Sequence, residues 1–149
     1  MPHIYVDADA CPVVRLVEEI AAAHGLPVTL LCDSAHRFAR EGAQTVTVDK
    51  GADSVDFALV NRVRPGDVVV TQDYGLAALC LARCATVLHQ NGFVYDEDNI
   101  DSLLMARHTA KKLRRAGGRL RGPAPRTRQQ DADFERCLRD VLARGRREG

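Results

Sequence analysis

Apolar and polar positions along the chain first predict a strand followed by a helix. Residues 3–8 form a short run rich in β-branched and aromatic side chains. Apolar residues then recur at helical spacing over residues 11–24. Pro12 suits the first turn of this helix, and Gly25 followed by Pro27 ends it.

The same alternation continues through most of the sequence. Further strands are predicted at residues 28–32, 45–48, 67–71 and 85–89, and further helices at 54–63, 74–83, 99–115 and 131–144. Strands alternating with helices of about ten residues are typical of a mostly parallel sheet that is covered on both faces. The predicted fold class is therefore α/β, a three-layer sandwich with a mostly parallel central sheet.

Length and composition are those of an ordinary globular domain. The 149 residues are 46% hydrophobic and 28% charged, which argues against a disordered chain or a membrane protein. The longest apolar run, residues 76–82, is shorter than the roughly 18 residues that a membrane span needs. The N-terminal residues lack the pattern of an export signal. We therefore expect one domain over residues 1–149 and a cytoplasmic location.

Charge is distributed unevenly between the two parts of the chain. Residues 1–106 hold seven Lys/Arg against fifteen Asp/Glu, whereas residues 107–149 hold fourteen against five. The segment 116–130 combines Gly, Pro and Arg and predicts a basic arm. The acidic part suggests a bound cation and the basic part an anionic partner such as nucleic acid, unless the two only neutralise each other. The arm residues expected to contact phosphates are Arg119, Arg121, Arg126 and Arg128.

The five cysteines are scattered and odd in number, which suits reduced thiols better than a disulfide framework. Cys80 and Cys84 lie in an apolar segment without a matching His pair, so we expect core thiols and no zinc site. Cys11 stands near a predicted helix start, where a lowered thiol pKa could make it reactive. A buried structural role is the favoured interpretation of Cys11.

Carboxylates follow the predicted strands repeatedly. Because parallel strands end at one edge of a sheet, we expect these side chains to converge. Asp7 and Asp9 are two apart, so they would share a face if the first strand extends that far. Asp53 and Asp56 are three apart, as on one face of a first helical turn. The complete set comprises Asp7, Asp9, Asp49, Asp53, Asp56, Asp73, Asp96, Glu97 and Asp98.

Several carboxylates placed close together repel one another unless a cation or a proton separates them. Oxygen ligands of this kind suit Mg²⁺ or Mn²⁺, which also leave positions for water and for substrate phosphates. Each acid has a structural alternative, because Asp9, Asp53 with Asp56, and Asp73 all stand where helix starts are predicted. Capping does not explain the Asp7–Asp9 pair. The set of acids as a whole therefore favours the interpretation of a metal-dependent phosphodiesterase.

Several strings of the sequence resemble a known family. VDADACPV, VDKGADSVD, VVTQDYGLA, NGFVYDEDNIDSLL and GGRLRGPAPRT occur in order, followed by a last helix with Asp133 and Phe134, as in the YaiI/YqxD family of small bacterial proteins. That family is grouped by similarity with PIN-like domains, a metal-dependent nuclease fold. The resemblance implies that Asp7 is the acid of the first strand and Asp73 the acid after a central strand. Asp9, Asp53 and Asp56 belong to the family's own motifs.

These observations lead to one expected function and two alternatives. The expectation is a nuclease acting on RNA or DNA, with Asp7, Asp9 and Asp73 as catalytic metal ligands and Asp53 and Asp56 as further ligands. A non-catalytic nucleic-acid-binding or regulatory module would keep the same fold and cation site. An aspartyl-nucleophile phosphatase is suggested by DADAC, although Cys11 replaces the expected Thr or Val.

Overall fold

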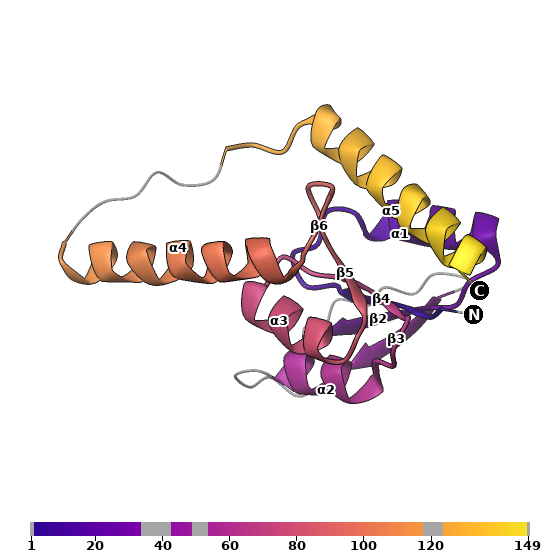
Figure 1. Ribbon diagram of the computed structural model, residues 1–149, viewed down its shortest axis with the longest axis horizontal. Coiled ribbons are helices and arrows are strands. Elements are labelled where there is room, and N and C mark those ends of the chain that lie inside the picture. The colour runs from indigo at the N-terminus through magenta and orange to yellow at the C-terminus, as the bar shows by residue number, and fades with distance from the viewer. Residues whose placement is uncertain (1, 34–42, 49–53, 118–123, 149) are drawn as a thin grey trace.

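The protein, seen in a computed structural model, is described over residues 2–33, 43–48, 54–117 and 124–148. These residues form a six-stranded sheet with helices on both faces (Figure 1). Neighbouring strands follow the order β3-β2-β1-β4-β5-β6, and all pairs are parallel except β5 with β6. The strands are β1 (Ile4–Asp7), β2 (Val28–Cys32), β3 (Ala43–Thr47), β4 (Val68–Val70), β5 (Thr86–His89) and β6 (Phe93–Val94). The three-layer α/β prediction is confirmed.

Helices cover the two faces of the sheet in separate layers. The described helices are α1 (Val14–His24), α2 (Ser54–Arg62), α3 (Tyr74–Ala82), α4 (Glu97–Arg115) and α5 (Arg128–Glu148). Helices α1 and α5 pack on one face, and α2, α3 and the beginning of α4 pack on the other. The rest of α4 extends well beyond the sheet (Figure 1).

The sequence of β1 shows why both faces are covered. Ile4 and Val6 are fully buried in the core beneath α1 and α5, whereas Tyr5 is buried in the core beneath α2 and α3. Successive side chains of a strand point to opposite faces, so consecutive apolar residues such as Ile4, Tyr5 and Val6 need a helical layer on each side. The strands β2 and β4, which are buried at every position, follow the same rule.

The strand order places a reversal next to β1. The chain runs from β1 to β2 and β3 on one side and then returns to β4 on the other side of β1. In open α/β sheets, ligands bind outside the carboxyl ends of the strands at such a reversal. We call the edge where β1, β2, β4 and β5 end the carboxyl edge. Asp7 is the last residue of β1, and Asp73 follows β4.

The short strand β6 was missed in the sequence, and it corrects the expected position of three acids. Because β6 is antiparallel to β5, it leads the chain back toward the other edge of the sheet. Asp96 there lines a cavity together with Pro65 and with Thr86 at the start of β5. The expectation that Asp96, Glu97 and Asp98 converge with Asp7 was therefore wrong.

The last helix also begins earlier than expected. The arm was predicted to continue to Gln130, but α5 starts at Arg128. A capping box explains the difference: the Gln130 N–H donates to Thr127 Oγ1 at 3.2 Å, and the Thr127 N–H donates to Gln130 Oε1 at 2.9 Å. No helix within the described residues is both long and apolar enough to cross a lipid bilayer.

Candidate functional site

A chain of hydrogen bonds connects the ends of β1 and β4. The Thr71 hydroxyl donates to Asp7 Oδ2 at 2.9 Å, and the Asp73 N–H donates to Thr71 Oγ1 at 3.0 Å. Asp73 Oδ1 in turn accepts a hydrogen bond from the Leu76 N–H at 3.1 Å and so caps α3. Thr71 therefore fixes the orientation of Asp7 at the strand-order reversal, beside the cap of the next helix.

The carboxyl group of Asp7 has a strongly perturbed pKa. Burial, and to a smaller extent the charges of Asp56, Asp73 and Asp9, raise the pKa of Asp7 from 3.8 to about 6, against the opposing hydrogen bond from Thr71. Each of these acids therefore lies close enough to disfavour the charge on Asp7. A partly buried carboxylate surrounded by like charges is a feature of functional sites more often than of solvated surfaces.

Asp9 lies beyond the end of β1, so it does not share a strand face with Asp7 as expected. Its Oδ2 accepts a hydrogen bond of 2.7 Å from the N–H of Asp33, which follows β2. Ala10 takes a left-handed conformation with φ 58°, and the Cys11 N–H donates to the Ala8 carbonyl. This turn carries the chain from β1 toward α1 and places Asp9 on the β2 side of Asp7.

Asp56 stands in the first turn of α2 and is partly exposed. Its charge contributes to the raised pKa of Asp7, so Asp56 lies near Asp7 at the carboxyl edge. Asp49 and Asp53 lie outside the described residues. Among residues whose positions are described, no group of three or more His, Cys, Asp or Glu side chains is arranged to hold a metal ion.

The basic arm is described only near its end. Arg119 and Arg121 lie outside the described residues, and Arg128 is exposed at the beginning of α5. Arg126 instead joins α5 to the hairpin between β5 and β6. Its guanidinium donates to Asp131 Oδ1 at 2.7 Å, to Asn91 Oδ1 at 2.8 Å and to the Gln90 carbonyl at 2.8 Å. Arg126 thus has a structural role that its place in the arm did not indicate.

The cysteines agree with the expectation of reduced thiols, because all five are free. Burial raises the pKa of the Cys11 thiol to about 11 and that of Cys80 to about 12, so neither is an activated nucleophile. Cys84 was expected in the core, but it is exposed in the turn after α3 with φ 63°. The expectation was wrong because the helix ends before this residue.

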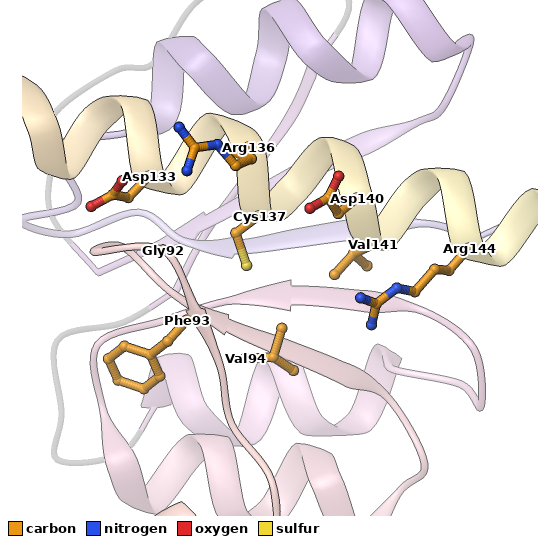
Figure 2. Close-up of a pocket in the computed structure, with 9 residues that line it drawn as sticks. All are labelled: Gly92, Phe93, Val94, Asp133, Arg136, Cys137, Asp140, Val141 and Arg144. Atoms are coloured by element: carbon orange, nitrogen blue, oxygen red, sulfur yellow. The ribbon is translucent and has the colours of Figure 1, made fainter.

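Two cavities lie away from these acids. One is a groove of about 330 Å³ between β6 and α5, where Cys137 and Val141 face Gly92 and Val94 (Figure 2). The other, of about 710 Å³, lies where β4 and β5 begin. Neither is lined by Asp7, Asp9 or Asp73. The candidate site at the reversal therefore rests on the chemistry of its acids and not on these two cavities.

Two features of the carboxyl edge were missed in the sequence. Thr71 holds Asp7, and its place directly after an apolar strand was the available signal. The second feature is a group of rings, formed by Tyr74, His89, Phe93 and Tyr95 and called here the aromatic cluster. These residues are scattered over 22 positions of sequence, so only the fold brings them together.

Comparison with known proteins places the chain among close relatives. The family model described as "Uncharacterized BCR, YaiI/YqxD family" matches residues 5–144. A UPF0178 protein of Exiguobacterium sibiricum is 55% identical over 139 residues, covering 93% of this chain and 95% of that protein. A UPF0178 protein of Clostridium acetobutylicum is 50% identical over 145 residues, covering 96% and 98%. No solved structure matches the chain. The chain thus belongs to the YaiI/YqxD family.

Proposed function

We propose that this protein is a metal-dependent phosphodiesterase of PIN-like type, a nuclease that acts on RNA or DNA at the carboxyl edge. The observation that carries the proposal is the position and environment of Asp7. Asp7 ends β1 at the strand-order reversal, and burial with three neighbouring carboxylates raises its pKa to about 6. Asp9 and Asp73 are the proposed companions of Asp7, with Asp53 and Asp56 as further ligands.

The donor chemistry of these acids fits a hard divalent cation. Carboxylate oxygens are the ligands that Mg²⁺ and Mn²⁺ take, and Mg²⁺ is commonly bound by one or two carboxylates together with water and substrate phosphates. A complete protein cage of three ligands is therefore not required. A cation beside Asp7 would also offset the repulsion that raises the pKa of its carboxyl group.

The roles proposed for the chain's own groups follow from their contacts. Thr71 keeps one oxygen of Asp7 in a fixed direction, and the backbone of Asp73 keeps Thr71 in place. When bound, the cation would activate a water molecule and stabilise the oxygen that leaves the phosphorus atom. Exposed cationic side chains near the C-terminal part, including Lys111, Lys112 and Arg128, would contact backbone phosphates together with Arg119 and Arg121.

One set of contacts favours a second candidate, a nucleic-acid-binding module without turnover. Asp73 caps α3, and Asp9 holds the N–H of Asp33. Groups with such structural roles would persist in a protein that had no catalytic activity. Cleavage and binding therefore have to be measured separately.

The deciding experiment is a cleavage assay with labelled single-stranded and duplex oligonucleotides in Mn²⁺, Mg²⁺ or chelator. The proposal expects metal-dependent cleavage that is lost in Asp7→Asn and retained in Asp101→Asn, a matched change at an exposed acid of α4. Binding without cleavage by the parent chain would support the module. Turnover of a small phosphomonoester, with oligonucleotides left intact, would support the aspartyl-phosphatase alternative.

A further inference from the structure

The aromatic cluster lies at the carboxyl edge on the face covered by α2 and α3. Tyr74 begins α3, His89 ends β5, and Phe93 begins β6. His89 and Tyr95 are buried, whereas Tyr74 and Phe93 are partly exposed. The side chains of Tyr74 and Phe93 therefore reach solvent, and they contact the buried rings of His89 and Tyr95.

Phe93 is supported on one face of its ring. The rings of His89 and Phe93 are stacked, with centroids 4.6 Å apart and planes 9° from parallel. Tyr95 meets both rings at steep angles, 5.2 Å from Phe93 and 5.9 Å from His89. If Tyr95 covered the outer face of Phe93, it would lie much farther from His89, so Tyr95 stands beside the stack. The Phe93 ring also points away from α5 (Figure 2).

The ring beneath Phe93 is held in place by the hairpin. The Asn91 N–H donates to His89 Nδ1 at 2.9 Å, which requires that this nitrogen carry no proton. Burial, together with the charge of Arg126, lowers the pKa of His89 and favours the neutral imidazole. Phe93 is partly exposed and rests on a neutral, fixed ring, and these two features make it a suitable surface for a further flat ring.

The aromatic cluster is connected directly to the acids. The Tyr95 hydroxyl donates to the Thr71 carbonyl at 3.2 Å, and the Thr71 hydroxyl donates to Asp7. Tyr74 follows Asp73 in the chain, and its ring centroid lies 6.4 Å from that of His89 and 6.1 Å from that of Tyr95. The carboxyl edge thus continues from Asp7 and Asp73 past Tyr74 to Phe93.

We infer that the outer face of Phe93 stacks on an unpaired base of a single-stranded nucleic acid that lies along the carboxyl edge. This inference rests on the proposed function and narrows its substrate class to single strands. In a duplex both faces of an interior base are covered by its neighbours, whereas an unpaired base offers a face to an aromatic side chain. Stacking of this kind tolerates any base, so little sequence preference is expected.

The experiment uses the full chain in chelator, where cleavage cannot destroy the probe. The sequence contains no Trp, so Phe93→Trp introduces a single indole at the proposed platform. Its fluorescence is titrated with single-stranded oligodeoxyadenylate and with an abasic oligonucleotide of equal length, which keeps the phosphates and lacks the bases. Phe57→Trp is the matched control, because Phe57 is 64% exposed on α2. We expect base-dependent quenching at position 93 and none at position 57.

Affinity measurements by fluorescence anisotropy complete the test. Phe93→Leu is expected to weaken binding of the adenylate by about 5-fold to 100-fold, while Phe93→Tyr keeps it and the abasic affinity stays the same. Thermal melting of each variant shows whether it remains folded. Equal quenching by both oligonucleotides, equal loss for both in Phe93→Leu, or no binding at all would overturn the inference.

The outcome is separable from that of the nuclease proposal. Asp7-dependent cleavage without base-dependent quenching at position 93 would overturn the platform alone. Base-dependent quenching without any cleavage would overturn the nuclease and leave the platform in a binding module.

Discussion

Neutralising Asp7 is expected to stabilise the fold at neutral pH. Removing a carboxylate that is paired with a cationic group would instead be expected to lower the stability. The pKa of Asp7 is about 6 in the folded chain against an ordinary 3.8, because burial and neighbouring carboxylates disfavour its charge. Between pH 4 and pH 6 the folded state therefore holds a proton that the unfolded state has released. The contribution of Asp7 to the free energy of unfolding is therefore largest below pH 4, and it is lost as the pH rises through 6.

The size of the effect follows from the same two pKa values. A difference between 3.8 and about 6 corresponds to on the order of 3 kcal/mol at pH 7. Asp7 is partly exposed, so solvent screening reduces the expected gain in Asp7→Asn to about 1–2 kcal/mol. The Asn side chain keeps an oxygen that can accept the hydrogen bond from Thr71.

Urea denaturation in chelator between pH 4 and pH 8 measures this directly. The stability difference between Asp7→Asn and the parent should be near zero at pH 4 and should reach its full value by pH 7. Asp101→Asn, at an exposed acid of α4, should show no such rise. Parallel pH profiles for Asp7→Asn and the parent, or a less stable variant at pH 7, would refute the reasoning that the Asp7 charge is disfavoured in the folded chain.

Three further changes test contacts around this edge. Asp73→Ala should lose about 0.5–2 kcal/mol in urea denaturation because the α3 cap is removed, whereas Asp73→Asn should keep most of the stability. Gly92→Ala should cost about 2–4 kcal/mol, because its Cβ would lie 2.5 Å from the Asp133 carbonyl carbon; Gly66→Ala, also at positive φ but in open space, should cost about 1 kcal/mol. Arg126→Gln should lose about 1–3 kcal/mol and increase amide exchange at the start of α5, whereas Arg128→Gln should stay within about 0.5 kcal/mol of the parent. Equal effects within any one of these three matched pairs would contradict the contact assigned to its first member.

The regular helices and strands could be predicted from the sequence because burial requires apolar residues at regular positions, and that spacing is visible in the sequence. The apolar run of β2 and the helical spacing of α1 were located to within a few residues. The strand β6 has only two residues, Phe93 and Val94, too few to show a period. Because β6 was missed, the chain before Asp96 was expected to run in the direction opposite to the one it takes.

The acid pair at the reversal was also predictable, because Asp7 ends one apolar run and Asp73 comes three residues after another. Their partners were not, since hydrogen bonds such as Thr71 to Asp7 span 64 positions of sequence. The structural role of Arg126 was not predictable either, because a basic residue in a Gly/Pro-rich segment gives no sign of a distant side-chain amide and backbone carbonyl. The capping box of Thr127 and Gln130 was readable from the spacing and would have placed the start of α5 correctly.

The central claim, that the acids at the ends of β1 and β4 hold a divalent cation, is tested most directly by anomalous diffraction from crystals soaked in Mn²⁺. We expect an anomalous peak at coordination distance from the Asp7 carboxylate, on the side of Asp73, that is absent from crystals of Asp7→Asn. A peak only elsewhere on the molecule, or none near Asp7 at millimolar Mn²⁺, would contradict the account.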